Sequence, residues 1–71
     1  MTIKFLCVSC NTKLSELTPP VPHCDYNFVP IAEQDVDSPW DVTPSGGLTL
    51  NNVKSGTYMV GKVYTFAWRV V

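Results

Sequence analysis

The sequence predicts an all-β protein, a small antiparallel β-sandwich or barrel-like unit with a long, proline-rich irregular arm. The last third of the chain alternates large apolar with mixed residues, which is typical of a half-buried strand. No window combines a 3.6-residue apolar period, a helix cap and ten residues free of proline, so no helix is expected. All six prolines fall between residues 18 and 47, and such stretches favour loops.

The 71 residues predict a single small β domain, residues 1–71, in three parts. These are an N-terminal strand with a cysteine knuckle (1–17), an extended arm (18–47) and C-terminal strands (48–71). A chain this short buries only about 60% of its unfolded surface. We therefore expect a metal, a disulfide or a partner subunit to add stability.

In the N-terminal part, the alternation of Met1–Leu6 predicts the first strand. The next residues, Cys7–Asn11, predict a turn, because two cysteines three apart would lie on opposite faces of a straight strand. The run Thr18–Pro22 cannot be helix interior or central strand, since three of its five residues lack a backbone donor. Residues 26–31 are compatible with a strand, which Pro30 would restrict to the edge of a sheet.

In the C-terminal part, we expect a strand at Leu48–Val53, a turn at Lys54–Gly56 and a strand at Thr57–Val60. Two continuations remain open. In one, Gly61 begins a two-residue type II′ hairpin. In the other, Thr57–Val70 is one long strand with a bulge at Gly61.

One short run carries a resemblance. Val53-Lys54-Ser55-Gly56-Thr57-Tyr58-Met59-Val60 resembles the apolar-x-x-Gly-x-Tyr-x-Val run that ends many immunoglobulin-like β-sandwiches. The resemblance implies that Gly56 makes a turn and that Tyr58 packs into the core. It also implies a small Greek-key or sandwich-like unit, completed by another chain.

The cysteines predict a candidate structural zinc site. Ile3–Leu14 is similar to the first knuckle of a zinc ribbon, but the place of a second cysteine pair holds Pro22-His23-Cys24-Asp25. A tetrahedral set of four ligands would be structural, since it leaves no open position for catalysis. Reduced thiols and one disulfide with a thiol left over are the alternatives. The candidate ligands are Cys7, Cys10, His23 and Cys24.

Charge and motifs exclude several classes of function. A net charge of −1 argues against a dedicated nucleic-acid binder. No nucleophile–base pair and no phosphate-binding glycine loop indicates an enzyme. No apolar run reaches the roughly 18 residues of a membrane span, and no secretory signal is visible, so we expect synthesis in the cytoplasm. All six acids lie between Lys13 and Lys54, in a solvated loop or a segment that docks on a basic partner.

Charged residues make up only 15% of the chain, which suggests that other protein covers part of its surface. We therefore predict a non-enzymatic, homo-oligomeric structural protein that binds a larger protein assembly through its middle arm. Its profile is similar to that of viral capsid decoration or cement proteins, which would place it in the virion. The alternative is a zinc-ribbon-like binding module that contacts nucleic acid or a protein complex. The predicted interface residues are Trp40, Tyr64, Phe66 and Trp68, for which packing within the chain is the competing interpretation.

Overall fold

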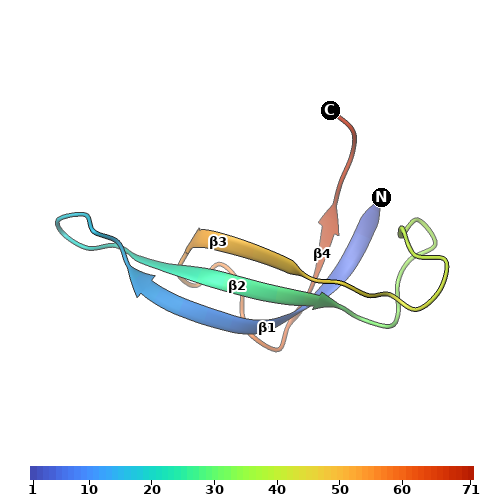
Figure 1. Ribbon diagram of the computed structural model, residues 1–71, viewed down its shortest axis with the longest axis horizontal. Helices are drawn as coiled ribbons and strands as arrows, with labels where there is room; N and C mark the ends of the chain where they lie inside the picture. The colour runs from blue at the N-terminus through green and yellow to red at the C-terminus, as the bar shows by residue number, and fades with distance from the viewer.

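The computed structural model describes all 71 residues and contains four strands and no helix. The strands are β1 (Thr2–Leu14), β2 (Pro22–Pro30), β3 (Leu48–Lys54) and β4 (Val63–Ala67). They form one antiparallel sheet in the order β3-β2-β1-β4 (Figure 1). The all-β prediction is confirmed. The sheet stays open, with β3 and β4 as its edges, and does not close into a barrel. No helix is present that could span a membrane.

β1 holds the sheet together because it pairs with a different strand on each side. Its N-terminal half, Thr2–Leu6, pairs with β4, whereas Phe5–Leu14 pairs with β2. The register with β2 shifts between Cys7 and Ser9, so Val8 is an extra, bulged residue. Such a bulge reverses which residues face the core after it. Cys7 faces the core before the bulge, and Cys10 shares a face with buried Tyr26 after it.

The predicted turn at Cys7–Asn11 is therefore wrong. β1 continues straight through these residues, and the bulge at Val8 does what the turn was expected to do. With one extra residue in the strand, two cysteines three apart come to the same face.

β2 lies inside the segment that was predicted to be an irregular arm, and it is a central strand rather than an edge. Proline is tolerated here because it occupies only the two ends of the strand. The pairing with β3 runs from His23 to Phe28 and stops before Pro30, so the missing amide is not needed there. The remaining irregular segment is Ile31–Gly47, together with the short loop 15–21 that joins β1 to β2.

Beyond β3, the chain departs from both predicted continuations. Residues 55–62 form a loop with no strand at Thr57–Val60, and β4 begins only at Val63. The reason is topological, because this loop must cross from one edge of the sheet to the other. Gly56 and Gly61 have φ of 83° and 89°, values that glycine adopts without steric cost. The turn predicted at Lys54–Gly56 is confirmed.

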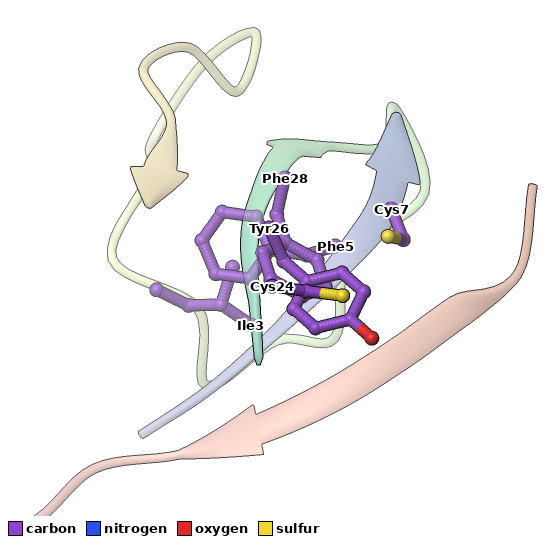
Figure 2. Close-up of a cluster of buried hydrophobic side chains, with 6 residues drawn as sticks. All are labelled: Ile3, Phe5, Cys7, Cys24, Tyr26 and Phe28. Atoms are coloured by element: carbon purple, nitrogen blue, oxygen red, sulfur yellow. The ribbon is translucent and has the colours of Figure 1, made fainter. Parts of the chain in front are cut away.

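The core lies on one face of the sheet and is largely aromatic. Tyr58, from the 55–62 loop, packs edge-on against Tyr26 and Phe28, with ring centroids 5.3 and 5.2 Å apart. The roles that the immunoglobulin-like resemblance implied for Gly56 and Tyr58 are thus confirmed, although the structure has one sheet and not two. Figure 2 shows the six buried side chains, which are Ile3, Phe5, Cys7, Cys24, Tyr26 and Phe28.

Candidate functional site

The strand register places two cysteines side by side on the core face of β1 and β2. Cys10 lies opposite Tyr26, and Cys24 lies opposite Thr12 on the next pair but one. The Thr12 hydroxyl oxygen is 3.8 Å from the Cys10 sulfur and 3.5 Å from the Cys24 sulfur. Cys10 is exposed, whereas Cys24 is buried, and all the cysteines are free thiols. The two thiols and the hydroxyl form one polar cluster at the border of the core.

The surroundings of the thiols shift their pKa values in different directions. Hydrogen bonds from Thr12 and then from Cys10 lower the pKa of Cys24 to about 7. The same thiol–thiol hydrogen bond, followed by burial, raises the pKa of Cys10. Burial raises the pKa of Cys7, with the nearby Cys10 as the second cause. Cys24 is therefore the thiol that most readily carries a negative charge near neutral pH.

The structure does not gather the four residues predicted as zinc ligands into one set. His23 precedes Cys24 in β2, so its side chain projects from the opposite face of the sheet. Cys7 lies opposite Phe28, further along the strand from the pair of Thr12 and Cys24. No group of three or more His, Cys, Asp or Glu side chains is placed to hold a metal ion.

Three of the four predicted interface residues pack against the core of their own chain. Trp40, Tyr64 and Phe66 are half-buried and line the aromatic cluster. Trp68 is 39% exposed and packs edge-on against Phe5, with ring centroids 6.1 Å apart. The four interface assignments remain predictions, and Trp68 presents the most open surface of the four.

Trp68 also joins the two ends of the chain. Its amide donates to the Met1 carbonyl oxygen over 2.8 Å, and its own carbonyl accepts from the N-terminal amine over 3.2 Å. An open, mainly apolar hollow lies beside this contact, lined by Met1, Trp68, Arg69 and Val70.

Part of the acidic middle segment is tied to β1 and is not free in solvent. The Lys4 amine lies 3.3 Å from an Asp35 carboxylate oxygen, and the Thr2 hydroxyl donates to Asp37 over 2.8 Å. The Gln34 amide group accepts from the Lys4 amide over 2.9 Å and donates to the Lys4 carbonyl over 2.8 Å. Beyond the end of β2, the Gln34 side chain and the Ile31 amide, which donates to the Lys4 carbonyl oxygen over 3.2 Å, thus take the place of a strand partner for β1. The segment Ile31–Gly47 docks on its own sheet.

The sequence did not predict a projecting hairpin, residues 8–24. It consists of the C-terminal half of β1, the loop 15–21 and the first residues of β2 (Figure 1). On the side away from β2, β1 has no strand partner beyond Cys7, whose backbone bonds to Gly61 and Lys62. Two hydrogen bonds close the loop 15–21 at its tip. The Ser15 amide donates to the Val21 carbonyl oxygen, and the Val21 amide donates to the Ser15 hydroxyl oxygen. Three large apolar side chains at the tip are exposed, namely Leu14, Leu17 and Val21.

The apolar residues of this hairpin are present in the sequence, but the prolines and polar residues among them hide the strand pattern. Leu14, Leu17 and Val21 stand among three polar or charged residues and two prolines, a composition that predicts irregular chain. The prolines lie in the loop and at the strand end, where they do not interrupt pairing.

No protein-family model matches the chain, and no curated protein or solved structure shows significant similarity to it.

Proposed function

We propose that this chain is a non-enzymatic structural protein that binds to and stabilises a larger protein assembly. Capsid decoration and cement proteins are the class whose general profile it shares. The observation that carries this proposal is the extended shape of the molecule, which leaves far more surface open than a chain of this size normally exposes.

The dimensions and the accessible surface of the molecule both exceed those of a compact domain of this length. The sheet is a single layer, and the molecule measures 47 × 29 × 16 Å. Its radius of gyration is 14.3 Å, against roughly 11 Å for a compact domain of this length. Its accessible surface is 5262 Å², against roughly 4400 Å² for a folded monomer of this mass. The excess is similar to the roughly 800 Å² that each partner buries in a standard protein interface.

The projecting hairpin is the part of the molecule best suited to make this contact. The unpaired edge of β1 offers backbone groups to which another chain can add a strand. Its only charged residue, Lys13, is already paired with Asp25 of β2. The exposed Leu14, Leu17 and Val21 then supply an apolar anchor at the tip. The segment Ile31–Gly47 is less suited than the sequence suggested, because Gln34 and Asp35 hold it on β1.

The same open edge supports self-association. An antiparallel pairing of two copies along Val8–Leu14 would continue the sheet across a twofold axis. Homo-oligomer formation and attachment to a larger assembly are thus both proposed to use the hairpin.

The test is to sediment particles from the native source and to follow the protein through the gradient. We expect it in the fast fraction at a fixed ratio to a larger protein. Stripped particles should rebind the recombinant protein and melt at a higher temperature with it. A protein that stays at the top of the gradient as a monomer, and that stripped particles do not rebind, would contradict the proposal.

A matched pair of variants locates the contact. Leu17→Asp places a charge at the hairpin tip, and Val36→Asp makes the same change on the Ile31–Gly47 segment, where Val36 is fully exposed. Neither change touches the core, so both variants should fold. We expect Leu17→Asp to weaken rebinding at least tenfold and Val36→Asp to leave it unchanged. The reverse result would assign the contact to the middle segment, as the sequence alone predicted.

A further inference from the structure

The proposed assembly contacts use the backbone edge of β1 and the apolar hairpin tip, and they give no role to the thiols of the polar cluster. Cys10 and Cys24 project from neighbouring strands onto the same face, as a diagonal pair of the antiparallel ladder. Diagonal neighbours of this kind are within reach of each other's side chains. The Thr12 hydroxyl oxygen lies between them, 3.8 Å from the Cys10 sulfur and 3.5 Å from the Cys24 sulfur. Diagonal neighbours lie about 7–8 Å apart, slightly more than a disulfide spans, so bond formation requires rotation of both side chains and a small approach of the two strands, with the register unchanged.

We propose that Cys10 and Cys24 are a redox-active dithiol, which small-molecule disulfides of the glutathione class convert into a cross-strand disulfide linking β1 to β2.

The reaction proceeds in two exchange steps. The Cys10 thiol gives up its proton, and its sulfur attacks one sulfur of the oxidised glutathione. A mixed disulfide forms at Cys10, and the first glutathione leaves as a thiolate that takes up a proton. The Cys24 thiolate then attacks the Cys10 sulfur, the mixed disulfide breaks, and the second glutathione leaves in the same way. Two protein thiols are oxidised to one disulfide, and one glutathione disulfide is reduced to two glutathione thiols.

Exposure assigns the two roles. Cys10 is open to solvent and is where a bulky disulfide can enter, whereas Cys24 is only 1% exposed. The Thr12 hydroxyl, which is the largest cause of the lowered pKa of Cys24, supports the second step, because a thiolate is the attacking species. Cys7 takes no part, since it is fully buried and lies opposite Phe28, beyond the Cys10–Tyr26 pair.

The experiment incubates the reduced protein with oxidised glutathione, then blocks the remaining thiols with iodoacetamide in urea, which exposes the buried Cys7, and measures the intact mass. We expect the protein to lose two hydrogens and to take up one blocking group. Trypsin should then release the peptide that ends at Lys13 joined to the peptide that contains Cys24, because no Lys or Arg lies between Lys13 and Lys54. Closing a loop of this length should also raise the melting temperature by several degrees.

Single serine variants identify the pair. Cys7→Ser should form the internal disulfide like the parent protein. Cys24→Ser should stop at the mixed disulfide with glutathione, and Cys10→Ser should form no internal disulfide. A product that joins Cys7 to either cysteine would overturn the proposal. A parent protein that stops at the glutathione adduct, or that forms the disulfide only in urea, would overturn it too. The readout uses the isolated protein, so it is independent of the assembly role.

Discussion

Phe28 is the residue on which the core depends most. It is 1% exposed, and it packs edge-on against Tyr58 and Phe66, with ring centroids 5.2 and 5.4 Å apart. These partners come from the 55–62 loop and from β4, which are both far from β2 in the sequence. Such aromatic pairs stabilise a core beyond the area that they bury. One side chain thus joins three separate segments.

We expect Phe28→Ala to lower the free energy of unfolding by about 3–5 kcal/mol, as for other buried Phe→Ala changes. A domain of this size has roughly 4–11 kcal/mol in total, so the variant should be partly or wholly unfolded at 25 °C. Urea denaturation followed by circular dichroism would measure the change. Phe66→Ala is the control, because Phe66 is only half-buried and its loss should cost clearly less. Equal costs would show that Phe28 has no central role.

Asp25 makes the stability of the fold depend on pH in the acidic range. The Lys13 amine, and then the Asn52 amide, which donates to the carboxylate over 3.1 Å, hold the pKa of Asp25 below its usual value. A lowered folded-state pKa stabilises the fold above the unfolded value, about 3.9, and this contribution disappears as the pH falls through the folded value.

We therefore expect the melting temperature of the parent protein to fall more steeply below about pH 4 than that of Asp25→Asn. Above that pH the variant should be the less stable of the two. Calorimetry across pH 2–7 would measure both curves. Lys13→Met removes the main cause and should flatten the curve similarly, whereas Lys62→Met, at an exposed lysine with no ion pair, should not. Parallel curves for all variants would contradict this assignment.

At the scale of elements, the decisive contact is between the irregular segment Ile31–Gly47 and β1. β2 ends at Pro30, opposite Phe5, and beyond it the Lys4 backbone receives one backbone hydrogen bond on that side, from the Ile31 amide to the Lys4 carbonyl oxygen over 3.2 Å. The Gln34 side chain fills the position with an acceptor and a donor, and its amide nitrogen also donates to the Ile31 carbonyl over 2.9 Å. A side-chain amide thereby extends the sheet by one residue and fixes where the segment begins.

Gln34→Glu tests this contact with almost no change of shape. The carboxylate still accepts from the Lys4 amide, but it cannot donate to the carbonyl oxygens of Lys4 and Ile31. We expect a loss of about 1–3 kcal/mol, measured by urea denaturation, with faster amide exchange in residues 31–47. Glu33→Gln makes the opposite change at an exposed neighbour and should stay within about 0.5 kcal/mol. A Gln34→Glu variant as stable as the parent would show that the other contacts of the segment hold it without the Gln34 amide.

At the scale of the whole molecule, the chain folds as a thin, bent sheet with one covered face. Only six residues are buried, while fourteen large apolar side chains are exposed. Single exposed apolar residues are ordinary, but here several gather at the hairpin tip and around the hollow at the chain ends. The monomer therefore leaves apolar surface open that an assembly can bury.

The heat capacity of unfolding should report this directly. A compact domain of 71 residues would show roughly 0.9–1.1 kcal/mol/K, in proportion to its length. We expect the isolated monomer to fall clearly below this range, because the folded state already exposes much of its apolar surface. Differential scanning calorimetry at low concentration would measure it, with light scattering as the control for the monomeric state. A monomer with a full-sized value would show that the surface is buried in solution.

Much of the secondary structure was predictable because it depends on local alternation and turn chemistry. β3, the glycine turn at Gly56, the core position of Tyr58 and the absence of helices follow from residues close together in the sequence. The extent of β2 and the missing strand at Thr57–Val60 did not follow. The prolines predicted an irregular segment or an edge strand, although a proline disrupts strand pairing only where the partner strand requires its amide.

The sequence by itself determined the class of the fold and the apolar face of its strands, because period-two alternation is a local property. Only the tertiary structure decided which strands pair, and a single bulge at Val8 decided which side chains meet. That extra residue brings Cys10 to the core face beside Thr12 and Cys24, while strand alternation sends His23 to the other face. The predicted zinc ligands were thus separated and a dithiol was assembled, by a register that depends on two strands at once.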